Sequence, residues 1–150
     1  GDLQSVLKTA MQDGGPIAAL EACNIEAGDI ARNNSAASGW SVGRTSLKVR
    51  NADNAPDAWE LKTLLSFEQR KAAGTDASQI EHAEVLTNDS GTVFRYMKAI
   101  PTSGLCISCH GNHLSPAVSK KVNSLYPHDK AVGFAADDIR GAFSMQKALK

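Results

Sequence analysis

The pentapeptide Cys106-Ile107-Ser108-Cys109-His110 is the feature that most constrains what this 150-residue chain can fold into. Two cysteines separated by two residues and followed directly by a histidine have the spacing of c-type haem attachment. The two thiols add across the two vinyl groups on one edge of a porphyrin. The next residue, His110, can then give an imidazole nitrogen to the iron. The motif therefore predicts one covalent haem c, around which the rest of the chain has to fold.

Two other readings of this cysteine pair compete with haem. A thioredoxin-like dithiol would open a helix directly after a strand, whereas Gly104 before the motif and Gly111 after it predict a loop. A structural zinc site needs two more ligands, and a second cysteine pair is missing. The histidines available to replace that pair are His110, His113 and His128. The sequence favours a haem attached in a loop over both alternatives.

Composition and charge exclude several classes of protein. Sixteen basic residues balance sixteen acidic ones, whereas a nucleic-acid-binding protein usually carries a basic excess. This balance of charge predicts no nucleic-acid partner. No run of about 18 apolar residues occurs, so we expect no membrane span in this chain. The length fits one domain. We therefore expect a single haem domain over residues 1–150, with residues 1–15 forming a short helix and a break.

The haem motif also predicts where the protein works. Covalent haem attachment takes place outside the cytoplasmic membrane, so we expect a bacterial periplasmic protein. The chain starts at Gly1 and shows no signal-peptide pattern, which predicts a processed or trimmed start. Cys23 has no cysteine partner once Cys106 and Cys109 carry the haem. It is either a small buried apolar residue or an iron ligand.

Hydrophobic periodicity predicts an α+β chain with a small antiparallel sheet flanked by N-terminal helices. We expect helices over residues 2–12, 16–32, 56–71 and 116–125. We expect strands over 40–49, 80–87 and 92–100, the last two joined as a hairpin. Residues 134–135 and 140–147 are expected to be edge strands. Cys23 lies on the apolar face of the second helix, formed by Ile17, Leu20, Cys23, Ala27 and Ile30.

Several blocks of the sequence resemble a known family. They are Gly39-Trp40-Ser41-Val42-Gly43-Arg44-Thr45-Ser46, Arg50-Asn51, Asn54-Ala55-Pro56-Asp57-Ala58-Trp59-Glu60, Arg95-Tyr96-Met97 and the haem motif. Together they resemble the small bacterial single-haem c-type cytochromes with a PAS-like (Per-Arnt-Sim-like) haem domain. The resemblance extends from about residue 16 to residue 145. It implies a PAS-like fold and an unusual His/Cys-ligated haem whose thiolate comes from a helix near the N-terminus, the position of Cys23.

The residues alone leave the second iron ligand open. The candidates are Cys23, Met11, Met97, Met145, His82, His113 and His128. The resemblance selects Cys23 opposite His110. A thiolate ligand favours ferric iron and lowers the reduction potential. It can also protonate and leave when the iron is reduced, which suits a sensor better than a carrier.

The remaining conspicuous side chains have structural as well as functional interpretations. Arg44, Arg50 and Lys48 are either propionate-binding cations or ordinary solvated charges. Tyr96 and His113 are candidates for the haem edge, whereas His82 and His128 are expected at the surface. Trp59 is expected in the core. Turn and helix-capping roles are expected for Asn51, Asn54, Asp57 and Glu60.

These observations predict a periplasmic electron carrier, or a redox or gas sensor that binds CO, NO or O2 when reduced. The alternative is a haem enzyme with peroxidase-like chemistry, which would need Cys23 to leave the iron and a distal acid–base group. A dithiol redox protein is the third class. The sequence names no redox partner, and the neutral net charge predicts no strong electrostatic steering.

Overall fold

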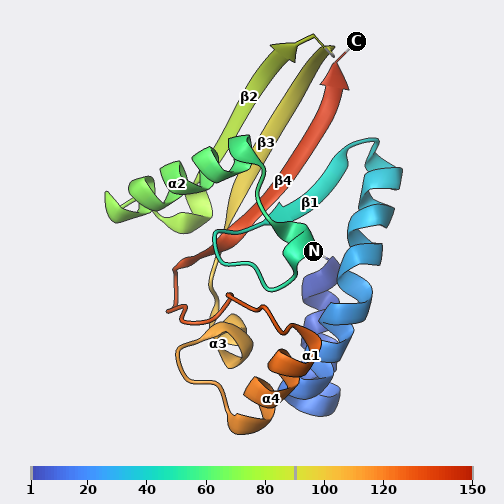
Figure 1. Ribbon diagram of the computed structural model, residues 1–150, viewed down its shortest axis with the longest axis vertical. Helices are drawn as coiled ribbons and strands as arrows, with labels where there is room; N and C mark the ends of the chain where they lie inside the picture. The colour runs from blue at the N-terminus through green and yellow to red at the C-terminus, as the bar shows by residue number, and fades with distance from the viewer. Residues whose placement is uncertain (1, 90, 150) are drawn as a thin grey trace.

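A computed structural model describes residues 2–89 and 91–149, which form an α+β fold around one antiparallel sheet (Figure 1). The strands are β1 (Ser41–Thr45), β2 (Glu81–Asn88), β3 (Gly91–Pro101) and β4 (Ile139–Leu149). Their order in the sheet is β1-β4-β3-β2. The predicted fold class and the β2–β3 hairpin are confirmed.

The C-terminal strand departs from the prediction. Residues 134–135 are not a strand, and β4 lies inside the sheet between β1 and β3 instead of at an edge. Ala142 and Ser144 of β4 are consequently buried. Alternation of apolar and polar residues shows which face of a strand is covered, but not how many strands flank it.

The first helical element, α1 (Asp2–Ser38), is two helices joined by a sharp bend. Gly14 and Gly15 leave the helical conformation, and Gly15 has a φ of +66°. The Asn34 side-chain amide donates a hydrogen bond to the Asp2 carboxylate over 3.1 Å. The two halves therefore run back alongside each other (Figure 1). The predicted break is confirmed.

The second half of α1 continues to Ser38, although the polar run after residue 32 predicted its end. The hydroxyl of Ser35 donates to the Ala31 carbonyl over 2.9 Å, and the hydroxyl of Ser38 donates to the Asn34 carbonyl over 2.7 Å. These serines satisfy their polar groups within the helix, so they do not end it.

Helix α2 (Ala58–Ala72) covers one part of the sheet and carries the main core. Its start is the predicted capping box, in which the side chains of Asp57 and Glu60 each accept a backbone N–H of the other residue. Trp59 packs against the core, as expected. The buried residues of this core are Leu64, Phe67, Ala77, Ile80, Met97, Ala99, Ile139 and Ala142. Two 3-10 turns, η1 (Ala52–Asn54) and η2 (Ala77–Gln79), flank the helix.

A second core joins α1 to α3 (Gly104–His110) and α4 (Pro116–Leu125) at the lower end of Figure 1. Its members are Ile17, Leu20, Cys109, Leu114, Val118, Val122 and Leu125. The bounds of α4 are those predicted. The Cys-x-x-Cys-His motif, however, lies on the short helix α3 and not in a loop. Gly104 begins this helix and Gly111 caps it. Seven residues are too few for a helical period to be read from sequence.

The residues that the structure describes contain no helix long and apolar enough to cross a membrane.

Gly141 of β4 lies close to the backbone of β1. Its φ is +156°, and a Cβ there would lie 2.4 Å from the carbonyl oxygen of Thr45 in β1. The pairing of β3 with β4 is irregular at the same point, opposite Ile100. Only a residue without a side chain fits between the two backbones.

We predict that Gly141→Ala lowers the free energy of unfolding by about 1–3 kcal/mol, because the new methyl group overpacks against a backbone atom that cannot move aside. Chemical denaturation measures this change. Gly43→Ala is the matched control, since a Cβ there would meet only the Ser144 carbonyl oxygen, at 3.9 Å. Equal stability of the two variants would contradict the prediction.

Candidate functional site

His110, the last residue of α3, is fixed by the segment 129–134, which we call the strap. Its Nδ1 lies 2.7 Å from the carbonyl oxygen of Ala131. A carbonyl can only accept a hydrogen bond, so Nδ1 carries the proton and Nε2 keeps its lone pair. Burial lowers the pKa of His110 to about 3, and the charges of Arg140 and Arg50 act in the same direction. His110 is therefore a neutral imidazole with one nitrogen available to a metal.

The strap holds α3 at two further points. The backbone N–H of Phe134 donates to the His110 carbonyl over 3.0 Å, and the N–H of Gly133 donates to the Gly111 carbonyl over 3.2 Å. The Phe134 ring meets the imidazole edge to face, with 6.3 Å between ring centroids. The orientation of His110 thus depends on the path of the strap.

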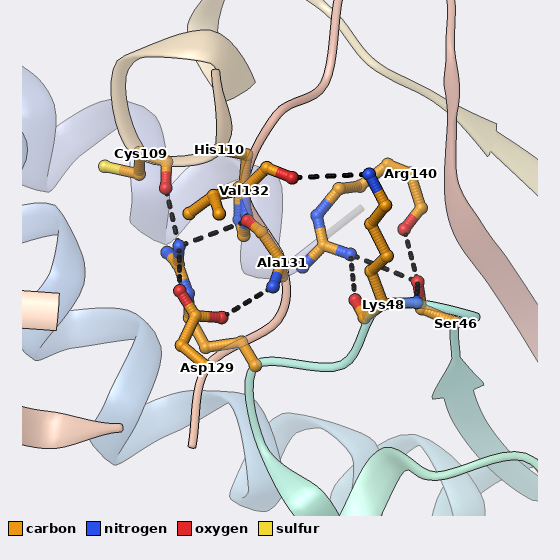
Figure 2. A network of polar contacts seen from close by, with 9 residues as sticks. Ser46, Lys48, Cys109, His110, Asp129, Ala131, Val132 and Arg140 are labelled. Atoms are coloured by element: carbon orange, nitrogen blue, oxygen red, sulfur yellow. Dashed lines mark hydrogen bonds and ion pairs between the residues drawn. The ribbon is translucent and has the colours of Figure 1, made fainter. Parts of the chain in front are cut away.

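A buried ion pair fixes that path (Figure 2). The Nη2 of Arg50 donates to the Cys109 carbonyl over 2.6 Å and to Asp129 Oδ2 over 3.0 Å, and it lies 3.3 Å from the Ala131 carbonyl oxygen. Asp129 Oδ1 accepts the Ala131 N–H over 2.8 Å. The side chains of Arg50 and Asp129 are 10% and 5% exposed. Arg50 thus links the motif to the strap, and its expected contact with a haem propionate stays a prediction.

Cys23 lies on α1 near the same motif. Cys109 packs against the small core that includes Leu20, which lies on the turn of α1 that precedes Cys23. Burial raises the pKa of the Cys23 thiol, and the neighbouring charges of Arg44 and Arg50 lower it. The pKa of Cys109 is raised by burial as well, and the charge of Cys23 adds to that rise. The three cysteines are free, and Cys23 is a neutral thiol at pH 7 in this arrangement.

Arg44 and Arg140 add positive charge to the site. Burial lowers the pKa of Arg44, and it lowers the pKa of Arg140 to about 10. The Nη1 of Arg140 lies 3.4 Å from the Ser46 hydroxyl and 3.5 Å from the Lys48 carbonyl oxygen. Asp129 forms an ion pair with Arg50 and its charge also acts on Arg140, whereas the charges that act on Arg44 are those of Cys23 and Tyr126. The site can therefore hold an anionic group.

Lys48 also points at the strap. Its Nζ lies 3.5 Å from the Val132 carbonyl oxygen and 5.0 Å from the centre of the Phe134 ring. Figure 2 shows Lys48, Ser46 and Arg140 beside the strap, on the other side from Cys109.

Tyr96 lies apart from this cluster. Its hydroxyl donates to the Glu81 carboxylate over 2.7 Å. Burial raises the pKa of Tyr96 to about 12, and the bond to Glu81 adds to the shift. Its ring lines a cavity of about 390 Å³ on the sheet, with Trp40 and Met145. The structure therefore places Tyr96 with the sheet and not with the cysteines.

The other candidate ligands are dispersed. Met97 is fully buried in the main core, where it packs among apolar side chains. Met145 lies on the sheet, and Met11 is half-buried in the first half of α1. The remaining histidines, His82, His113 and His128, are exposed.

Sequence reasoning missed Asp129, Arg140 and Phe134. Each acts on the motif through a contact that is distant along the chain. Arg50 and Asp129, for example, are 79 positions apart. A single sequence carries no local pattern for such a pair. The one available signal is the density of turn-forming residues after Tyr126, which marks residues 127–133 as a segment without regular structure.

Three comparisons with known proteins bear on the chain. The chain is similar to the cyanobacterial heme-protein Tll0287, whose crystal structure superposes with a TM-score of 0.61 at 28% sequence identity. The alignment covers 82% of this chain and 70% of that one. No curated protein matches the chain. The model of the Tll0287-like family matches residues 3–147, so the chain belongs to the Tll0287-like family.

Proposed function

We propose that this chain binds one haem c through thioether bonds to Cys106 and Cys109, with His110 and Cys23 as the axial ligands. In this proposal it is a bacterial periplasmic cytochrome with a PAS-like haem domain that transfers electrons or senses redox state or a gas. The observation that carries the proposal is the hydrogen bond from His110 Nδ1 to the Ala131 carbonyl, because it leaves Nε2 available to a metal on the short helix that also carries the two cysteines. The similarity to a heme-protein supports it.

The residues of the site fit such a group. The two thiols of α3 are free, the imidazole is neutral, and a third thiol lies nearby on α1. Arg50 and Arg140 lie near the Asp129 carboxylate and Arg44 lies near Cys23, so these guanidinium groups offer positive charge to the propionates of a haem. The buried Nε of Arg50 also lacks a hydrogen-bond partner among the described residues. When bound, haem supplies a one-electron Fe(III)/Fe(II) couple.

Cys23 is the residue whose protonation would change with the oxidation state of the iron. Burial raises the pKa of its thiol and keeps it neutral. Cys23 can therefore bind as a thiolate only beside a strongly positive partner in addition to Arg44 and Arg50. When that partner loses a positive charge, the preference of Cys23 for its proton returns. A ligand that is held in one oxidation state and released in the other favours sensing over simple electron transfer.

A peroxidase-like haem enzyme is the second candidate. It needs Cys23 to leave the iron and a polar group to remain beside the vacated position. Arg44 meets the second requirement, because its charge acts directly on the Cys23 sulfur. Turnover of peroxide by the reduced or Cys23-free protein would favour this candidate.

The ligand assignment is tested by replacing Cys23 with serine. We expect Cys23→Ser to abolish the thiolate charge-transfer features of the ferric visible spectrum and to raise the reduction potential, because a negative ligand is lost. Met97→Leu is the matched control and should leave both unchanged. An unchanged spectrum for Cys23→Ser would remove Cys23 from the proposal.

Carbon monoxide separates a sensor from a carrier. If Cys23 leaves on reduction, the dithionite-reduced protein should bind CO, which is seen as a shift of the Soret band. Cys23→Ala should bind CO without the delay that ligand release imposes. A reduced wild-type protein that binds neither CO nor NO would identify a plain electron carrier.

The protonation state of His110 predicts how stability depends on pH before haem is attached. The folded pKa of about 3 lies below the unfolded value of 6.5, so the unfolded chain takes up this proton first. Stability should be highest above pH 6.5 and fall as the pH decreases toward 3. Chemical denaturation of the haem-free Cys106→Ala/Cys109→Ala protein measures this slope. Adding His110→Gln should make the slope shallower, and equal slopes would contradict the prediction.

A further inference from the structure

The Ala131 carbonyl oxygen accepts from two donors at once. His110 Nδ1 approaches it to 2.7 Å and Arg50 Nη2 to 3.3 Å. Asp129 acts against this second donor, because it binds the same Nη2 over 3.0 Å and holds the Ala131 N–H over 2.8 Å. Figure 2 shows Asp129 and Ala131 of the strap beside His110. The imidazole of His110 and the guanidinium of Arg50 thus compete for the same carbonyl oxygen.

We propose that Arg50 and Asp129 are a positioning pair that sets the donor strength of His110 and thereby the reduction potential of the haem. This inference rests on the proposed function. Neither residue touches the imidazole through its own side chain, and both act through the Ala131 backbone. Neither role could be read from the sequence.

The two members of the pair act in opposite directions. Arg50 donates a hydrogen bond to the Ala131 oxygen and places a positive charge near His110. Both effects weaken the imidazole as an electron-pair donor to the iron and favour reduced iron. Asp129 neutralises that charge and favours the oxidised state. Because the two side chains are 10% and 5% exposed, solvent screens these charges only weakly.

The test is whether the two substitutions shift the reduction potential in opposite directions. In the haem-loaded protein, we expect Asp129→Asn to raise the reduction potential and Arg50→Gln to lower it. The double variant should return close to the wild-type value. A purely structural role would loosen the strap in both variants and admit water to the haem, which shifts both potentials in the same direction. Shifts of the same sign would overturn the inference.

Two variants control for charge and for general destabilisation. Arg50→Lys keeps the positive charge, so its potential should lie nearer to that of the wild type than the potential of Arg50→Gln. Glu60→Gln weakens another buried ion pair, with Arg95 at 3.4 Å, in a different part of the molecule. Its potential should equal the wild-type value. If either Asp129→Asn or Arg50→Gln fails to load haem, Asp129→Glu and Arg50→Lys replace them in the comparison. Reduction potentials that both fall below the wild-type value would again overturn the inference.

Failure of the proposed function is seen separately. It would appear in the wild-type protein as an absorption spectrum without bound haem, or as a spectrum that His110→Ala leaves unchanged. Failure of the positioning role would appear only in the potentials of variants that carry haem normally.

Discussion

The hydrogen bond between His110 Nδ1 and the Ala131 carbonyl is the interaction on which the rest of the site depends. It fixes the tautomer of His110, and it requires the strap to pass within reach of the end of α3. The strap has no regular secondary structure to hold it there. Its path depends instead on the Arg50–Asp129 pair and on the Lys130 N–H, which donates to the Val49 carbonyl over 2.9 Å. A buried ion pair is therefore tolerated here because it positions a functional group.

The main hydrophobic core and the candidate site lie in different parts of the fold. The main core lies between α2 and the sheet, where apolar side chains such as Leu64, Phe67 and Met97 are almost completely buried. The candidate site lies beside the smaller core of α1, α3 and α4, which contains Cys109. Substitutions in α2 should thus affect the stability of the whole chain more than the properties of the site.

Local features of the sequence predicted local features of the structure. The bend at Gly14 and Gly15, the Asp57–Glu60 capping box, the β2–β3 hairpin and helix α4 follow from neighbouring residues. Arg50 contacts the Cys109 carbonyl of the motif, whereas the iron-ligand role of Cys23 and the propionate-binding roles of Arg44 and Arg50 stay predictions. What could not be predicted depends on tertiary contacts. The interior position of β4 and the Arg50–Asp129 pair join segments far apart in the chain, and α3 is too short to show a period.

Helix α1 has one further consequence, because the helix that carries Cys23 also ends on the sheet. The Ser35 hydroxyl, three turns after Cys23, accepts the backbone N–H of Val42 in β1 over 2.9 Å. The helix that follows the bend at Gly14 and Gly15 thus connects Cys23 to β1. A rotation of this helix that withdraws Cys23 would strain the hydrogen bond between Ser35 and Val42. A change at the Cys23 sulfur would then alter the position of β1, the edge strand of the sheet.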